Sequence, residues 1–362
     1  MGKFSLVSAD SHVCEPADLW LKYIDPKFRE RAPRIRRDDL GEDSFFCDGV
    51  RLLGPARFSR AGKPGKGWGK TLADVYPGGY DPRARLKEIA VDGVEAEVLY
   101  PSVAMRLYEL PDPEMRRACF AAYNSWIADF CRACPETFKA LGMIDLDDVD
   151  LAVAEAKRVR ALGLPGVMIT VEGDDPSLYA TDSHGPFWAA VQEMGMPVSL
   201  HVITGMKPMP VFNHVNEIFI SGEAERSIVT MIFSGLFFRF PRLKVVSAEN
   251  EAGWAIYLLE RMDWLFQREN RRVNQDYPIK DLGVLPSEYF RRNIAMTFIW
   301  DKSAPEARRW VGVDNLMWSN DYPHDASSWP HSRAVLDDMF RGVPKDEVRK
   351  IVAGNAERLY GF

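Results

Sequence analysis

The sequence contains little of what marks several large classes of protein. Five cysteines among 362 residues are sparse and odd in number, which argues against a disulfide framework and favours a reduced, cytoplasmic protein. No apolar run reaches the length that a membrane span requires, and the first residues show no signal-peptide pattern. The net charge of −6 offers no basic excess, so we expect neither nucleic acid nor a membrane as a partner.

The composition is that of a globular protein with a sizeable core. Hydrophobic residues make up 46% of the chain and charged residues 27%, which is ordinary for such proteins. Three amphipathic segments predict helices: 113–134, 149–162 and 251–270. Eight short apolar runs predict strands: 4–9, 94–100, 139–144, 165–170, 197–201, 244–248, 294–298 and 315–319. Strands that alternate with helices in this way predict an α/β protein, a (β/α)8 TIM barrel, as a single domain over 1–362.

Two stretches interrupt the alternation. Residues 15–80 follow the first predicted strand and are rich in proline and charge, with a glycine- and lysine-rich tract at 61–70. We expect a small hairpin and a loop here. Because barrel active sites lie at the C-terminal ends of the strands, this insertion either covers the site as a lid or runs over the surface. Residues 204–228 also follow a strand and are expected to wall the pocket or an oligomer contact.

The tripeptide Asp10-Ser11-His12 ends the first predicted strand. Residues i and i+2 of a strand point to the same side, so Asp10 and His12 direct a carboxylate and an imidazole toward one point. Both groups are common ligands of divalent metal ions. The pair therefore predicts a metal site just inside the mouth of a barrel.

Two later strands end in residues of the same kind. His201 closes the run 197–201, and Asp321 follows the run 315–319. In a barrel all these strand ends surround one pocket, so Asp10, His12, His201 and Asp321 are predicted to share a metal ion. Such an ion lowers the pKa of a bound water and polarises a substrate oxygen, with Asp321 as a ligand, as a base toward that water, or as both.

With these motifs in view, the chain resembles the amidohydrolase superfamily, and within it the branch that includes aminocarboxymuconate-semialdehyde, dihydroxybenzoate and carboxyvanillate decarboxylases. The resemblance covers nearly the whole chain. It implies a metal-dependent barrel, with Asp10, His12, His201 and Asp321 at the metal positions, and the family habit of dimerising implies a homodimer. The matching stretches are 9–16 (ADSHVCEP), 80–86 (YDPRARL), 92–94 (DGV), 197–201 (PVSLH), 240–246 (FPRLKVV), 319–324 (SNDYPH) and 354–362 (GNAERLYGF).

The sequence departs from this family at two points. The first motif of the family is commonly His-x-His or Glu-x-His, whereas here it is Asp10-Ser11-His12. The decarboxylases of the family carry a Gly-His pair after the sixth strand, and that histidine serves in acid/base catalysis. Glu249 stands at the corresponding place here. This replacement weakens the decarboxylase interpretation that the resemblance otherwise supports.

Glu249 has two alternative interpretations. As a ligand, it adds a third carboxylate to the pocket and can bridge two metal ions. As an outer partner, it orients a ligand histidine. An oxygen-rich set of this kind suits Mn, Fe or Mg better than a thiolate-type zinc site. We expect one or two divalent ions, Zn, Mn or Fe, held by Asp10, His12, His201, Glu249 and Asp321.

Further residues complete the predicted site. His324 follows Asp321 at the catalytic face, so we expect His324, Asp321 and Glu249 to be catalytic. Four side chains near strand ends, or in the loops after them, are expected to contact substrate, with the arginine holding an anionic group: Trp20, Tyr100, Arg106 and Trp254. Cys131 and Cys134 form a Cys-x-x-Cys pair without a second pair, so they are predicted to pack in a helix.

These residues predict a metal-dependent enzyme that acts on a small molecule. The main hypothesis is a hydrolase acting on a small carboxylated or cyclic substrate through metal-activated water. The second hypothesis is a decarboxylase, or carboxy-lyase, acting on an aromatic or muconate-like acid. A third is a dinuclear Fe or Mn oxygenase, which requires two redox-active ions. A paralogue without catalytic activity that supports a partner subunit is a different class, and the intact ligand set argues against it.

Overall fold

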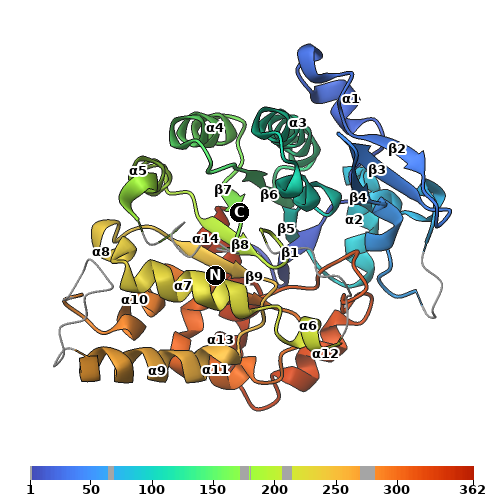
Figure 1. Ribbon diagram of the computed structural model, residues 1–362. Helices are drawn as coiled ribbons and strands as arrows, with labels where there is room; N and C mark the ends of the chain where they lie inside the picture. Colours follow the sequence, from blue (N-terminus) through green and yellow to red (C-terminus); the bar gives the residue numbers. More distant parts are fainter. Residues whose placement is uncertain (1, 64–68, 172–178, 180, 206–213, 270–281) are drawn as a thin grey trace.

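The computed structural model describes residues 2–63, 69–171, 179, 181–205, 214–269 and 282–362. Its main sheet holds eight parallel strands in the order β1-β5-β6-β7-β8-β9-β10-β11, surrounded by helices in Figure 1. The strands are β1 Val7–His12, β5 Ala96–Tyr100, β6 Phe138–Met143, β7 Gly166–Ile169, β8 Val198–His201, β9 Val245–Ala248, β10 Ile294–Phe298 and β11 Leu316–Trp318.

The ring of strands closes between β1 and the segment after β11. The backbone N–H of Asp321 donates a hydrogen bond of 3.1 Å to the carbonyl oxygen of Asp10, and that of His12 donates one of 2.7 Å to Tyr322. The predicted (β/α)8 barrel is therefore confirmed. Each of the eight apolar runs overlaps one observed strand, but β1 lies further along the chain than expected, because Ser11 and His12 still pair with β5.

Aspartate caps begin several of the helices between the strands. Asp81, Asp112 and Asp148 each accept hydrogen bonds from backbone N–H groups of the first turn that follows. The predicted helices correspond to α3, α4 and α9. The helices are α1 Leu19–Tyr23, α2 Pro82–Val91, α3 Pro113–Arg132, α4 Val149–Ala161, α5 Gly185–Glu193, α6 His214–Ile218, α7 Gly222–Phe233, α8 Leu236–Arg239, α9 Trp254–Glu269, α10 Pro286–Asn293, α11 Ala304–Val311, α12 Ser332–Met339, α13 Lys345–Arg349 and α14 Asn355–Tyr360.

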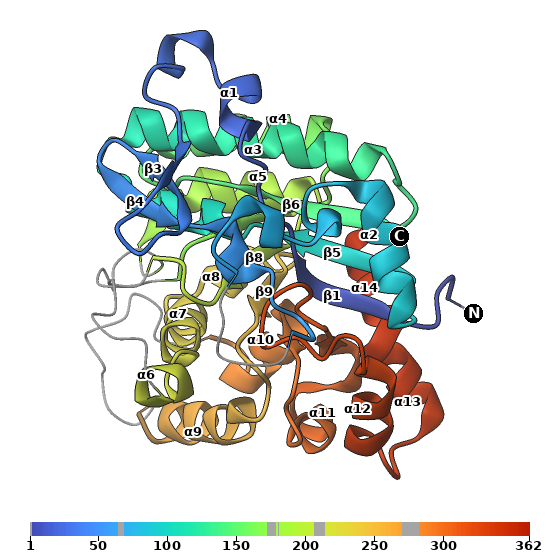
Figure 2. The same cartoon turned by 90° about the vertical axis from the view of Figure 1, so that its right-hand side faces the viewer.

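The predicted insertion forms a small antiparallel sheet of β2 Arg34–Arg37, β3 Asp43–Cys47 and β4 Val50–Leu53. Figure 2 shows this sheet at the end of the barrel opposite the N-terminus. The backbone N–H groups of Arg60 and Ala61 donate to the carbonyl oxygen of Pro323, at 2.8 and 2.9 Å. The insertion is therefore attached to the loop after β11. Residues 64–68 of the predicted insertion lie outside the described residues.

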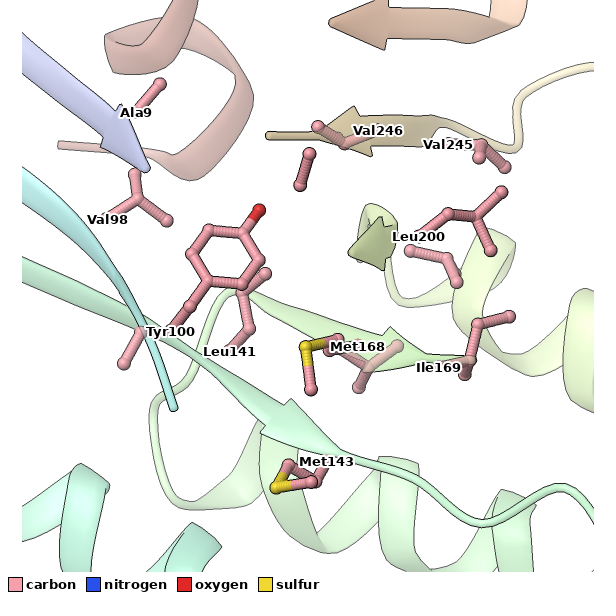
Figure 3. Packing of buried hydrophobic residues seen from close by; sticks show 14 of the residues in the cluster. Ala9, Val98, Tyr100, Leu141, Met143, Met168, Ile169, Leu200, Val245 and Val246 are labelled. Atoms are coloured by element: carbon pink, nitrogen blue, oxygen red, sulfur yellow. The ribbon is translucent and has the colours of Figure 1, made fainter. Parts of the chain in front are cut away.

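Hydrophobic side chains fill the barrel interior. Figure 3 shows Val98, Tyr100, Leu141, Met168 and Leu200 packed together between the strands. The hydroxyl of Tyr100 reaches Ser199 Oγ at 2.9 Å, so even this polar atom has a partner. One large cluster of packed residues also includes side chains of the insertion, and the single domain over 1–362 stays a prediction. Within the described parts of the chain, no helix combines the length and apolarity needed to cross a membrane.

Candidate metal centre

Six ligand-type side chains meet at the C-terminal end of the barrel. Asp10 and His12 come from β1, His201 from the end of β8, and Glu249 from the residue after β9. Asp321 and His324 come from the loop after β11. The side chain of Glu249 is 19% exposed and that of His324 is 11% exposed, while the other four are fully buried. Among the described residues, the cluster is thus exposed to solvent only at Glu249 and His324.

Four of the six residues form a first group around a common point. Asp10 Oδ1 lies 3.5 Å from His12 Nε2 and 3.7 Å from His201 Nε2. Glu249 Oε2 lies 3.3 Å from each of the same two nitrogens. Two carboxylate oxygens and two imidazole nitrogens therefore alternate around one position, which suits a divalent ion.

The second group consists of His12, Glu249, Asp321 and His324, so it shares two residues with the first. Asp321 Oδ1 lies 3.4 Å from His12 Nε2 and 3.0 Å from His324 Nδ1. The rings of His12 and His324 are stacked, with their centroids 3.8 Å apart. This stacking brings the loop after β11 against β1, where the barrel closes.

Each imidazole is oriented by a hydrogen bond on the side facing away from the cluster. His12 Nδ1 lies 2.7 Å from the carbonyl oxygen of Pro101, and His201 Nδ1 lies 2.9 Å from that of Val202. A carbonyl oxygen only accepts, so both Nδ1 atoms carry the proton and both Nε2 atoms are free for a metal. In His324 the two nitrogens have the opposite roles: Nε2 makes the orienting hydrogen bond, and Nδ1 faces the cluster.

Ser102 settles the tautomer of His324. The hydroxyl of Ser102 donates its single hydrogen to the carbonyl oxygen of Val13, at 2.6 Å. The same hydroxyl oxygen lies 2.9 Å from His324 Nε2, and because its hydrogen is already used, it accepts a hydrogen bond there. Nε2 of His324 therefore carries the proton, and Nδ1 presents a lone pair beside Asp321. Three histidines thus offer three lone pairs to one cluster.

Two of the carboxylates stand on unusual backbone conformations. Glu249 has a φ of 56° and Asp321 a φ of 53°, in the left-handed region that residues other than glycine seldom adopt. Such a conformation costs about 1–3 kcal/mol and is typical of functional sites. Thr297 supports the first of them, because its Oγ1 accepts a 2.8 Å hydrogen bond from the N–H of Glu249 and donates one of 3.0 Å to Asp10 Oδ2.

Several buried polar atoms of the cluster make no hydrogen bond. They are Oδ1 of Asp10, Nε2 of His201 and both carboxylate oxygens of Asp321. Burying such groups without partners is costly, so a cluster of them that faces one point fits a bound cation. The donor set passes this test, and the centre can hold a divalent metal ion.

The pKa values of the cluster show how strongly its charges interact without a cation. Burial, followed by the charges of Glu249 and Asp10, raises the pKa of Asp321 well above its usual range. Burial lowers the pKa of His12 and of His324. Burial alone would also lower the pKa of His201, but Asp10 and Glu249 outweigh it and raise that pKa to about 9.

Tyr100 and Trp20, two predicted substrate contacts, are fully buried. The ring of Tyr100 lies 4.9 Å from that of His201, but its hydroxyl binds Ser199 inside the barrel. Trp20 donates from Nε1 to the carbonyl oxygen of Cys119 and packs against Phe45. Tyr100 thus packs against the ring of His201 from inside the barrel. The position of Trp20 gives no evidence for a substrate contact.

The other two predicted substrate contacts also have partners within the protein. Arg106 pairs with Glu109 at 2.8 Å in the segment after β5. Trp254 donates from its indole nitrogen to the carbonyl oxygen of Asn250 and lies against Phe290. Neither contact points to a ligand, because the sequence locates a residue in a loop but does not give the direction of its side chain.

The sequence interpretation missed a buried ion pair beside the centre. Arg85 and Glu97 are both fully buried and joined by two hydrogen bonds, of 2.8 and 3.0 Å. Arg85 also donates to the carbonyl oxygens of His12 and Tyr322, at 2.8 and 3.0 Å. Arg85 thereby fixes the backbone on both sides of the barrel closure. The position of Arg85 within the motif 80–86 was the feature of the sequence that could have indicated this role.

Comparison with known proteins shows the family of the chain. Residues 76–362 match the family model described as amidohydrolase. The chain belongs to the amidohydrolase family. This amidohydrolase is 30% identical over 307 residues to the 2-amino-3-carboxymuconate-6-semialdehyde decarboxylase of Dictyostelium discoideum, covering 81% of its own length and 80% of that relative. It is therefore an enzyme of the superfamily that the sequence motifs resemble.

Solved structures share the fold of this amidohydrolase. An amidohydrolase from Mycobacterium avium subsp. paratuberculosis K-10 superposes with a TM-score of 0.77 at 22% identity, covering 100% of this chain and 99% of the other. A dihydroxybenzoic acid decarboxylase from Polaromonas sp. JS666, with bound manganese and the inhibitor 2-nitroresorcinol, gives a TM-score of 0.65 at 19% identity, covering 99% and 97%.

Proposed function

We propose that this amidohydrolase is a metal-dependent carboxy-lyase that removes carbon dioxide from a small aromatic or muconate-like carboxylic acid. The observation that carries the proposal is the buried cluster of Asp10, His12 and His201, whose ligand atoms face one point at the mouth of the barrel. The names of its relatives support the choice of reaction, since both a carboxymuconate-semialdehyde and a dihydroxybenzoic acid decarboxylase are among them. The second hypothesis from the sequence thus has more support than the main one.

The reaction breaks the bond between an unsaturated carbon of the substrate and its carboxylate. The electron pair of that bond stays on this carbon, carbon dioxide leaves, and a proton takes its place. A bound divalent ion supplies positive charge that holds the substrate's anionic oxygens. Thr297 and the carbonyl partners of the histidines keep the ligand atoms fixed while the substrate binds.

The proton enters from the side of the cluster that reaches solvent. Glu249 and His324 are the two cluster side chains with exposed surface, while Asp10, His12, His201 and Asp321 have none. Together with Asp321, they form the half of the centre that we propose to be catalytic. The replacement of the family's histidine by Glu249 therefore leaves polar groups at the place where protonation occurs.

A screen of carboxylic acids tests the proposed reaction. Protein loaded with Mn²⁺ is incubated with 2,6-dihydroxybenzoate, 5-carboxyvanillate and related ring acids, and released carbon dioxide is measured. We expect release from at least one acid, loss of that release in Asp10→Asn, and full activity in His331→Ala, an exposed histidine that belongs to neither group of ligands. No release from any acid by metal-loaded, folded protein would contradict the proposal.

Hydrolysis is a second candidate, favoured by one observation. Glu249 and Asp321 place two carboxylates beside the ligand histidines, and such groups serve as bases toward a metal-activated water. The same screen includes lactones and amides of these ring compounds. Cleavage of a lactone or an amide, without release of carbon dioxide from the acids, would identify the enzyme as a hydrolase. A homodimer and a cytoplasmic location stay predictions.

A further inference from the structure

We propose that Glu15 is a positioning residue of the metal centre. Its buried carboxylate holds the segment 101–104, and this segment in turn sets the orientation of His12 and His324. Glu15 lies within the motif 9–16, but no step of the proposed reaction uses it. The inference deepens the proposed function, and it rests on that function only in taking the metal centre as the active site.

The carboxylate of Glu15 binds three consecutive backbone N–H groups. Oε1 accepts from Ser102 and Ala104, each at 3.0 Å, and Oε2 accepts from Val103 at 2.9 Å. A 3₁₀-helix, Val103–Glu109, begins here, and the first N–H groups of a helix have no partner within it. The side chain of Ser102 does not cap this helix, so Glu15 supplies the cap from another segment of the chain.

The segment that Glu15 holds carries the partners of two histidines. The carbonyl oxygen of Pro101 accepts from His12 Nδ1 at 2.7 Å, and Oγ of Ser102 accepts from His324 Nε2 at 2.9 Å. The two imidazoles are also stacked on each other, with their centroids 3.8 Å apart. A shift of this one segment therefore moves the hydrogen-bond partners of both rings at once.

The chain that follows β1 runs beside this segment. The N–H of Val13 donates to the carbonyl oxygen of Tyr100 at 3.0 Å, and the hydroxyl of Ser102 donates to the carbonyl oxygen of Val13 at 2.6 Å. Glu15 follows two residues later and is only 1% exposed. Without its carboxylate, three buried N–H groups would lose their acceptor. Buried donors without partners are costly, so we expect the segment to move in order to find others.

The orientation of His12 decides whether this residue can bind a metal ion. While the carbonyl oxygen of Pro101 accepts from Nδ1, that nitrogen carries the proton and Nε2 presents its lone pair to the cluster. If the carbonyl oxygen moves away, either nitrogen of the neutral ring can carry the proton, and a proton on Nε2 blocks the ligand atom. Loss of Glu15 therefore weakens metal binding, although Glu15 belongs to neither group of ligands.

Metal affinity is the first test. Glu15→Gln keeps the shape of the side chain, but its amide NH₂ group faces an N–H donor where the parent has an acceptor oxygen. Titration of protein stripped with a chelator should show an affinity for Mn²⁺ about 10-fold or more below that of the parent. Asp148→Ala is the matched control, because Asp148 also accepts from backbone N–H groups at a helix start and belongs to neither group of ligands. We expect this control to lose stability and to keep the parent affinity.

The tautomer of His12 is the second test, and it needs no metal. Nitrogen-15 NMR of cation-free protein with labelled histidine shows which ring nitrogen carries the proton. It is recorded at pH 8, above the ordinary pKa of histidine. The signals of His12 are identified by their loss in His12→Gln. We expect the proton on Nδ1 in the parent and in Asp148→Ala, and a mixture of both tautomers in Glu15→Gln.

Should Glu15→Gln fail to fold by circular dichroism, Glu15→Asp takes its place, because it keeps the charge but withdraws the carboxylate by one methylene group. A folded variant with the affinity of the parent and with the proton of His12 on Nδ1 would overturn the proposal. Neither measurement uses a substrate, so the outcome is separate from the reaction: absence of carbon dioxide release refutes the carboxy-lyase alone.

Discussion

Thr297 joins Asp10 to Glu249 through a single hydroxyl group. Its Oγ1 donates to Asp10 Oδ2 at 3.0 Å and accepts from the backbone N–H of Glu249 at 2.8 Å. The bond to Oδ2 of Asp10 turns the other carboxylate oxygen, Oδ1, toward the histidines. The bond from the N–H of Glu249 holds that residue in its left-handed conformation. One side chain on β10 thus positions ligands on β1 and after β9.

Removing this hydroxyl is expected to weaken metal binding. Thr297→Val keeps the shape of the side chain but loses both hydrogen bonds, and loss of an outer partner of a ligand typically costs about 10–100-fold in metal affinity. Thr297→Ser retains the hydroxyl and is expected to stay close to the parent. Titration of the stripped protein with Mn²⁺ measures both; equal affinities in the two variants would show that Thr297 merely fills space.

The buried pair of Arg85 and Glu97 is expected to be essential for stability. Arg85→Met leaves Glu97 as an unpaired buried charge, which costs about 3–5 kcal/mol. Arg83→Met, an exposed position on the same helix, is the matched control and should change the free energy of unfolding little. Urea unfolding gives both values. A loss in Arg85→Met no larger than in the control would mean that Glu97 is protonated or solvated in the native protein.

Loss of the metal is expected to make stability depend on pH. In the cation-free protein the pKa of His201 is raised to about 9, above the ordinary value of 6.5 for histidine. A raised pKa contributes stability that is complete below about pH 6.5 and is lost as the pH rises toward 9. Asp321, whose pKa is also raised, acts in the same direction.

Thermal unfolding at several pH values checks this. We expect the midpoint of the cation-free protein to fall between about pH 6.5 and 9, and the Mn²⁺-loaded protein to keep its midpoint there, because the ion replaces the proton. His201→Gln should remove most of the fall in the cation-free protein. The same fall in the loaded protein would place its origin outside the centre.

The cysteines are expected to be unreactive in the folded protein. Burial raises the pKa of Cys14 and of Cys119, and raises that of Cys131 to about 12. Four of the five cysteines are buried, and Cys134 is partly exposed. A thiol reagent at pH 8 should therefore modify at most one cysteine before denaturation and all five after it, and Cys134→Ser should abolish the early reaction. Rapid modification of two or more thiols would argue against the described packing.

Much of the fold and of the ligand set follows from the sequence for a physical reason. Strands of a parallel barrel are buried on both faces, so they appear as continuous apolar runs, and their ends lie together. Asp10, His12, His201 and Asp321 stand at such ends, which is why four residues far apart in the chain are predictable as neighbours.

The rest depends on side-chain direction, which no strand pattern supplies. Trp20 and Trp254 lie in segments at the correct end of the barrel, yet each indole donates to a backbone carbonyl, of Cys119 and of Asn250. Thr297 is the one polar residue of the predicted strand 294–298, but the run does not show that its hydroxyl binds Asp10 and Glu249.

The closure between β1 and the segment after β11 has a consequence for biosynthesis. The hydrogen bonds from Asp321 to Asp10 and from His12 to Tyr322 join β1 to a segment that a ribosome makes only after all the other strands of the barrel. A nascent chain that has emerged only as far as β10 holds Asp10 and His12 but lacks Asp321 and His324. The centre therefore obtains its full set of ligands only after the segment that follows β11 has been made, and a chain that stops at β10 is left without its closing ligands.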